Sequence, residues 1–272
     1  MPRSPRAAWR RAGSALFAVA TGTNVSTPLL LLYADRLDLS GPATTVVFGV
    51  YAAGLAPSLL AAGPLSDRFG RRRVVVPTAA LAGVASLLFV LAADSFALLL
   101  VARFLQGLVS GAVFTAGSAW LAELCAAEGE EAAAGRRATV RLAGGFALGP
   151  LVSGVVAVLL PGPLVLPYAL HALLVVACVL PLRGVPETAP QRPPRHLRVA
   201  EPLLPRGSRL LATTALAPVA VCVYAFPATL VAALPLLVAL PGTGVLASGL
   251  LAGLTLGTGA VVAPLQRRLG SW

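Results

Sequence analysis

Charged residues are scarce in this sequence of 272 residues, and lysine is absent from it. Only 11% of the residues are charged, 57% are hydrophobic, and the mean hydropathy is +0.86. A soluble domain carries about a quarter charged residues, so the polar residues here are too few to cover a soluble surface. Apolar stretches of about 20 residues recur, and each is long enough to cross a bilayer. The composition therefore excludes one large soluble core and predicts an all-α integral membrane protein.

Cysteine is also rare, which excludes two kinds of framework. The three cysteines, Cys125, Cys178 and Cys222, show neither the spacing of a metal site nor that of a disulfide framework. The aspartate-rich metal motifs of a membrane prenyltransferase are missing as well. We therefore expect no metal, no cofactor and no catalytic residue, and we interpret the cysteines as packing residues.

The apolar runs predict eight spans separated by polar connections. The spans are expected at residues 13–33, 44–65, 74–93, 96–122, 138–160, 164–182, 209–234 and 244–265. Proline and arginine dominate residues 183–208, which predicts an exposed cytoplasmic linker without helix. This linker divides the chain into a complete six-span half, residues 1–182, and the first two spans of a second half, residues 209–272.

Basic residues are distributed unevenly between the connections. All 21 are arginine, and all except Arg36 and Arg103 lie in the N-terminus, in alternate connections or at the span ends next to them. The positive-inside rule gives this distribution for a multi-pass protein. It predicts that both termini are cytoplasmic, and it explains the net charge of +11 without a nucleic acid as partner.

The predicted second half repeats part of the first. A shift of 200 positions aligns six identical pairs: Gly49 with Gly249, Ala52 with Ala252, Pro64 with Pro264, Leu65 with Leu265, Arg68 with Arg268, and Gly70 with Gly270. The pattern P-L-x-x-R-x-G thus stands at a span end in both places. Parallel six-span repeats about an axis normal to the membrane are a known transporter architecture.

The connection between the second and third spans concentrates charge and glycine. It has the sequence GPLSDRFGRR over residues 63–72. Its glycines allow sharp turns, and Asp67 can pair with Arg68 or Arg71 nearby. The positive-inside rule accounts for the arginines, but it does not explain why Asp67 and Gly70 stand among them.

Two further motifs lie on later spans: RFLQGLVSG over residues 103–111 and GFALGPLVSG over residues 145–154. Together with the connection above, they resemble the motifs of the major facilitator superfamily, and in particular those of its drug/proton antiporters. The resemblance covers the whole chain and implies a helical bundle that works by alternating access. It is carried by Gly63, Leu65, Asp67, Arg68, Gly70, Arg71, Arg72, Arg103, Gln106, Gly107, Gly111, Gly145, Gly149, Pro150 and Gly154.

The resemblance implies a role for each motif. In the family, the loop aspartate, here Asp67, docks on a helix end of the opposite half. The loop arginine, here Arg71, engages an acid at the inner end of the fourth span, here Glu123. Arg103 is expected to help proton or substrate coupling, although it could instead snorkel to the outer surface. The small residues of the fifth-span motif imply close helix packing, which is typical of antiporters.

Few polar residues are available on the spans that face the central cavity in this family. On the first span they are Thr23, Asn24, Ser26 and Thr27. The aromatic residues Tyr224 and Phe226 lie on the seventh span and are further candidates for the cavity wall. Such a cavity suits small apolar organic compounds. Acidic residues fall at the ends of the predicted spans, whereas many proton-coupled relatives carry one within the first span.

We therefore predict transport and no enzymatic activity. The expected function is efflux of a drug-like compound or metabolite by proton-coupled antiport across the plasma (inner) membrane, with the oligomeric state left open. Two alternatives remain. An intramembrane serine protease could use Ser118 and His171, but their expected depths differ by about 25 Å, and His171 is then expected at the membrane interface. The second alternative follows from the number of spans: the family usually has twelve, so this chain, which ends at Trp272, could be a truncated, non-transporting fragment of a longer permease.

Overall fold

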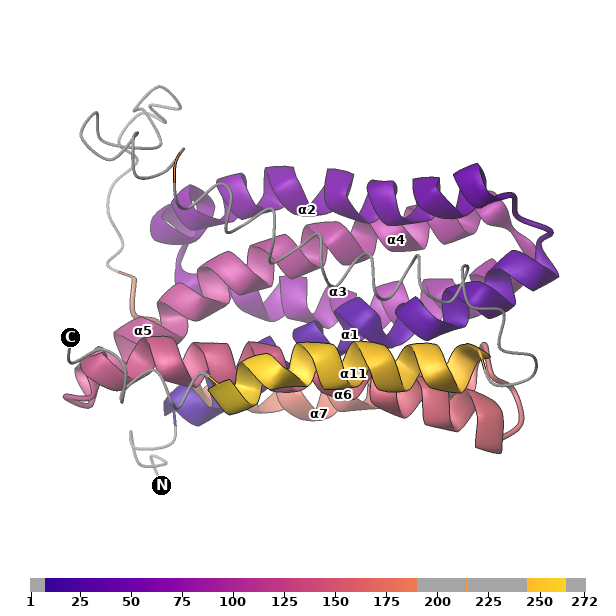
Figure 1. The fold of residues 1–272 in the computed structure, drawn as a ribbon. Coiled ribbons are helices and arrows are strands. Elements are labelled where there is room, and N and C mark those ends of the chain that lie inside the picture. Colours follow the sequence, from indigo (N-terminus) through magenta and orange to yellow (C-terminus); the bar gives the residue numbers. More distant parts are fainter. Residues whose placement is uncertain (1–7, 190–213, 215–243, 263–272) are drawn as a thin grey trace.

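The computed structural model describes residues 8–189, 214 and 244–262, and the long elements in these residues are helices (Figure 1). Their bounds are α1 Ala8–Arg36, α2 Gly41–Phe69, α3 Arg71–Leu91, α4 Phe96–Ala112, α5 Ser118–Ala127, α6 Ala134–Leu159, α7 Leu166–Val179 and α11 Gly244–Val262. Short 3-10 turns flank some of them: η2 Ala92–Asp94, η4 Glu131–Ala133 and η5 Leu180–Gly184.

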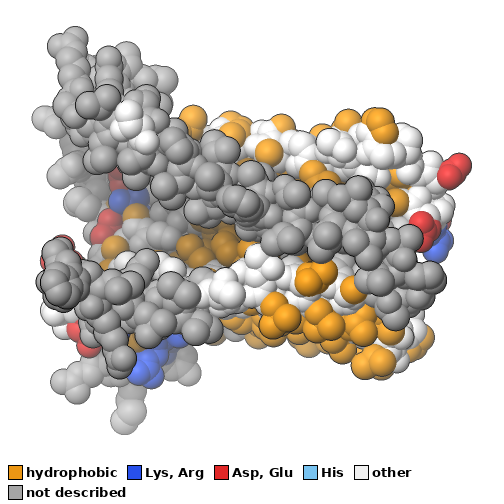
Figure 2. Space-filling model, viewed as in Figure 1, with side chains coloured by type: hydrophobic (Ala, Val, Ile, Leu, Met, Phe, Trp, Pro, Cys, Tyr) orange, Lys and Arg blue, Asp and Glu red, His pale blue; other side chains and the backbone are white. Residues whose placement is uncertain are grey.

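Six helical stretches in the described part of the chain are long and apolar enough to cross a membrane, and they match the first six predicted spans. The prediction of an all-α membrane bundle is confirmed. α11 covers most of the predicted eighth span, residues 244–265, whereas the predicted seventh, residues 209–234, lies outside the described residues except for residue 214. On the face drawn in Figure 2, hydrophobic side chains are visible along the bundle between its two ends, and the visible charged side chains lie near those ends.

α1 is the most enclosed helix of the described bundle. Inside the protein, 78% of its apolar window is buried, compared with 28% for α2 and for the span that contains α7. In Figure 1, α2 and α4 lie on one side of α1, and α6 and α7 lie on the other. Most buried positions of α1 carry small side chains, which let neighbouring helices approach closely in lipid.

α2 and α4 approach each other through glycines. A Cβ atom at Gly54 of α2 would overlap the backbone of Phe104, and a Cβ atom at Gly107 of α4 would overlap the carbonyl of Tyr51. Gly111 faces α2 in the same way, one turn further along. Two glycines of the fourth-span motif are therefore needed for backbone contact between these helices.

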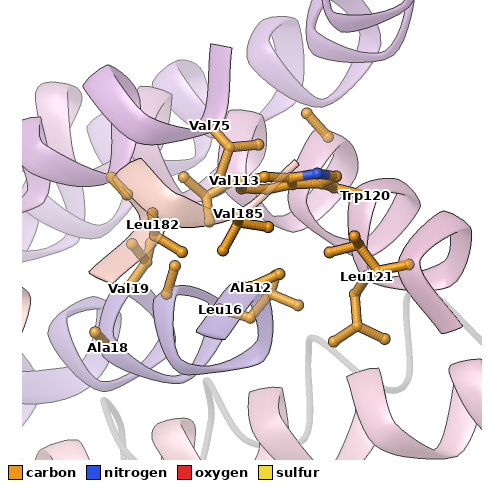
Figure 3. Close-up of a cluster of buried hydrophobic side chains, with 14 of the residues drawn as sticks. Ala12, Leu16, Ala18, Val19, Val75, Val113, Trp120, Leu121, Leu182 and Val185 are labelled. Atoms are coloured by element: carbon orange, nitrogen blue, oxygen red, sulfur yellow. The ribbon is translucent and has the colours of Figure 1, made fainter. Parts of the chain in front are cut away.

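The helix of the fourth span changes its hydrogen-bond pattern in the middle. The turn η3, Val113–Gly117, is π-helical and joins α4 to α5. Its i→i+5 bonds enclose one residue more than the bonds of an α-helical turn. Beyond it, Trp120 enters a cluster of buried hydrophobic side chains that also holds Leu16 and Val113 (Figure 3).

Candidate functional site

The connection between α2 and α3 consists of a single residue, Gly70. α2 ends at Phe69 and α3 begins at Arg71. Gly70 has φ 105°, a value that residues with a Cβ atom rarely adopt. The tight turn predicted from the loop motif is therefore a sharp corner that depends on this glycine.

Arg71 links the ends of three helices at this corner. Its Nε and Nη2 atoms lie 3.0 Å and 2.9 Å from Glu123 Oε1 at the end of the fourth span. Its Nη1 donates to Ser66 Oγ at 2.5 Å, and Nη2 also pairs with Asp67, one turn earlier. The structure thus brings together Asp67, Arg71 and Glu123, and we call these three residues the loop network. Of the three, Arg71 is the most enclosed, since its side chain is only 11% exposed.

The other positions of the loop motif lie around this network without joining it. Leu65 is exposed, and the guanidinium of Arg68 lies 5.1 Å from the centre of the Phe69 ring. A Cβ atom at Gly63 would lie 3.7 Å from a methyl group of Thr115, which is an ordinary contact distance. The backbone N–H of Arg72 donates to a carboxylate from a distant part of the chain, which is described below.

Arg103 is buried within the bundle, with 2% of its surface exposed, and therefore does not snorkel to the outer surface. Its Nη1 donates to Gln106 Oε1 at 2.9 Å, and Gln106 Nε2 in turn donates to the carbonyl of Gly22 at 2.6 Å. Aromatic rings surround the guanidinium, with ring centres 5.4 Å away for Phe48 and 6.0 Å away for Phe89. Cation–π contacts of this kind stabilise a desolvated guanidinium.

His171 lies in the interior of the bundle, next to this chain of hydrogen bonds. It is 3% exposed. Its Nδ1 lies 2.6 Å from Ser86 Oγ on α3, and its Nε2 lies 2.9 Å from the carbonyl of Ala18 on α1. The ring packs directly on Gly22, where a Cβ atom would overlap it. Counting residues gave the depth of His171 in its span, but not the side of α7 that faces the core.

We expect Gly22→Ala to lower the stability of the bundle by about 1–3 kcal/mol, because the added methyl group overlaps the imidazole of His171. Removing the ring should relieve the clash. The double variant Gly22→Ala/His171→Ala should therefore lose less stability than the two single variants added together. Thermal unfolding in detergent measures all three variants, and strictly additive losses would contradict this packing relation.

The small residues of the fifth-span motif contact two different helices. Gly145 and Gly149 face α1, where a Cβ atom at Gly145 would lie 2.5 Å from the carbonyl oxygen of Phe17. Gly154 instead faces α11, and its Cβ atom would lie 3.1 Å from the Cα atom of Gly249. Pro150 is buried between these contacts, and its carbonyl lies against Gly249. The motif therefore joins α6 to the centre of the bundle and to α11.

The predicted cavity residues of α1 have polar partners of their own. Thr23 Oγ1 lies 3.0 Å from Ser110 Oγ of α4, and Thr27 Oγ1 lies 3.4 Å from Asn24 Oδ1. Thr23 also lines a cavity of about 10 Å³ beside His171. The other two candidates, Tyr224 and Phe226, lie outside the described residues.

The protease alternative finds no support in the described residues. The hydroxyl that meets His171 belongs to Ser86, whereas Ser118 begins α5 beyond the π turn. The cavity beside the Ser86–His171 pair measures about 10 Å³, which is room for about one water molecule at most. A peptide substrate needs a cleft of several hundred Å³.

The sequence matches the Major Facilitator Superfamily over residues 12–272. The chain belongs to the major facilitator superfamily, and it is a multi-pass membrane protein. It is similar to the multidrug resistance protein MdtL of Escherichia coli O45:K1 (strain S88 / ExPEC), with 42% identity over 88 residues, which is 32% of this chain and 22% of the relative. MdtL of Escherichia coli O139:H28 (strain E24377A / ETEC) is 41% identical over 88 residues. The match thus spans 22% of the length of these curated relatives.

Proposed function

We propose that this chain serves the efflux of small apolar organic compounds by alternating access, with protons as the counter-ion. One observation carries the proposal: Arg71 contacts both Asp67 and Glu123 at the corner between α2 and α3, in a chain that belongs to this superfamily. Charge pairs at a helix corner can be made and broken as the bundle changes shape, which alternating access requires.

The two acids of the loop network differ in how firmly they hold Arg71. The side chain of Glu123 is 34% exposed, and Arg71 contacts it through two nitrogen atoms. The side chain of Asp67 is 63% exposed, so water screens its attraction to Arg71 and the pair contributes about 0–1 kcal/mol. We infer that Glu123 and Ser66 keep Arg71 in place, while Asp67 is the partner that exchanges when the conformation changes.

The proposed substrate class follows from the surroundings and from the relatives. Thr23, Gln106 and His171 are hydrogen-bonded within the bundle. Most buried side chains of the described residues are hydrophobic, which suits an apolar ligand. MdtL is named a multidrug resistance protein, which supports a range of drug-like substrates. We propose that the plasma (inner) membrane holds the chain with both termini in the cytoplasm, as the arginine distribution predicts.

The proposal is tested by expressing the protein from its own gene in bacteria that lack their main efflux pumps and by following the accumulation of ethidium. The unchanged protein should lower ethidium accumulation, and collapse of the proton gradient should abolish the difference. Accumulation equal to that of cells without the protein would contradict efflux.

Asp67→Asn is expected to lower the efflux rate about 10-fold. A carboxylate at position 67 can leave Arg71 and bind the positive N-terminal end of another helix, whereas a neutral amide is not attracted to it in this way. Asp35→Asn is the matched control, since it makes the same chemical change to an exposed carboxylate at the C-terminal end of α1, outside the loop network. Expression and melting temperature should stay the same in both variants. Equal efflux by the two variants would remove Asp67 from the mechanism.

A further inference from the structure

The five residues after η5 return to the loop network. Residues 185–189, which we call the return segment, fall in the predicted exposed linker, yet Val185 is only 1% exposed. Figure 3 shows Val185 within the buried cluster, among Val113, Trp120 and Ala12. Trp120 Nε1 also donates to the carbonyl of Pro186 at 3.0 Å. An apolar side chain and one hydrogen bond from a side chain to a backbone carbonyl therefore fix the beginning of this segment on the bundle.

Glu187 of the return segment caps the start of α3. Its Oε2 accepts the backbone N–H of Arg72 at 3.1 Å, although the two residues are 115 positions apart. Its Oε1 accepts the N–H groups of Thr188 and Ala189 at 3.1 Å and 3.3 Å. The first N–H groups of a helix have no partner within the helix, and Gly70 has no side chain to supply one. Glu187 thus takes the position that an N-cap side chain usually takes, with a full negative charge.

The close fit between Glu187 and Gly70 gives a second reason for glycine in the loop motif. A Cβ atom at Gly70 would overlap Glu187 Oε2 and lie 2.9 Å from its carboxyl carbon. Gly70 therefore serves the corner in two ways, through its positive φ and through the space it leaves for the carboxylate.

Thr188 completes the contact with the loop network. Its Oγ1 donates to Glu123 Oε2, while Arg71 occupies Oε1 of the same carboxylate. Both oxygens of Glu123 are therefore hydrogen-bonded. Thr188 of the return segment therefore positions Glu123, the acid that anchors Arg71. Glu187 caps α3, the helix that begins at Arg71.

We propose that Glu187 and Thr188 are positioning residues of the loop network, so that the return segment fastens the corner between α2 and α3 to the end of α7. This inference rests on the proposed function where it concerns transport, and it adds to that function the segment that leads into the linker between the predicted halves. A conformational change that moves the linker would then act on Arg71 through Glu187 and Thr188.

The positioning role is tested first by hydrogen–deuterium exchange of the protein in lipid nanodiscs. In Glu187→Ala, the amide of Arg72 should exchange about 10-fold faster, because a hydrogen bond to a charged acceptor is lost. Glu187→Gln keeps an acceptor oxygen and should restore most of the protection, which a general loss of packing would not do. Glu131→Ala, an exposed acid before α6, is the control and should exchange like the parent. Unchanged exchange in Glu187→Ala would overturn the proposal.

The link to transport is tested by combining variants. Glu187→Ala should lower ethidium efflux about 10-fold, and in an Asp67→Asn background it should lower it no further, since both changes act on the same network. Independent losses that multiply would overturn the link. If the parent shows no efflux, the proposed function fails, while the exchange experiment still decides whether Glu187 holds the corner.

Discussion

Replacing Gly145 with alanine is expected to destabilise the bundle by about 3 kcal/mol or more, whereas the same change at the neighbouring Gly144 should cost less than about 1 kcal/mol. A methyl group at Gly145 would lie 2.5 Å from the Phe17 carbonyl oxygen and 2.7 Å from Cβ of Ala20, both on the central helix α1. Among the described residues, the same group at Gly144 would meet the Phe17 ring alone, at 3.6 Å. The two variants carry the same substitution at adjacent positions, so they differ in the surroundings of the added methyl group.

The difference in stability is measured by thermal unfolding in detergent, with the fraction of protein that stays monodisperse as the signal. Gly149→Ala should behave like Gly145→Ala, because its methyl group would overlap the carbonyl of Thr21 one turn further along α1. Equal melting temperatures for Gly144→Ala and Gly145→Ala would mean that α6 can shift away from α1 without loss, and the close approach would then not be required.

Arg103→Ala is expected to lower ethidium efflux by about 10- to 100-fold, because contacts to a buried charge are worth about 1.5–3 kcal/mol. The guanidinium is held by Gln106 and lies between the aromatic rings of α2 and α3. The variant should still fold. It loses the packing of the Arg103 side chain, but it no longer has to bury a charge, which is itself costly, and the two effects offset each other. The effect should therefore be seen in the rate of efflux and not in the amount of protein.

The control for Arg103 is Arg36→Ala at the C-terminal end of α1. Arg36 donates two hydrogen bonds to Asp94 Oδ1, at 2.9 Å and 2.7 Å, but the pair is exposed and contributes about 0–1 kcal/mol. Its loss should leave both efflux and stability unchanged. Efflux by Arg103→Ala at the rate of the parent would show that this buried charge has no part in transport.

The positions of the spans could be predicted from the sequence because a bilayer fixes the length of each apolar run. The sharp corner at Gly70 could also be expected, since glycine within a charged connector indicates a tight turn. The pair between Arg71 and Glu123 was expected from the resemblance to the superfamily, which implies that the loop arginine engages an acid at the end of the fourth span.

The contacts of His171 and Glu187 could not be predicted in the same way. Each depends on which side of a helix or segment faces a part of the chain many positions away: Ala18 for His171 and Arg72 for Glu187. Proline and arginine after residue 183 indicate an exposed linker, and that pattern hides the few residues that pack on the bundle. An acid a few residues after a span end, as at Glu187, is a weak signal of helix capping.

The π turn η3 changes the rotation of the side chains in the middle of the fourth span. Each residue of an α-helix turns the chain by about 100°, so an insertion or deletion in α4 would rotate every side chain that follows. η3 takes up an additional residue within a single wide turn. The direction in which Glu123 faces, relative to Gly107, is therefore set by this wide turn and differs from the direction that a continuous α-helix would give.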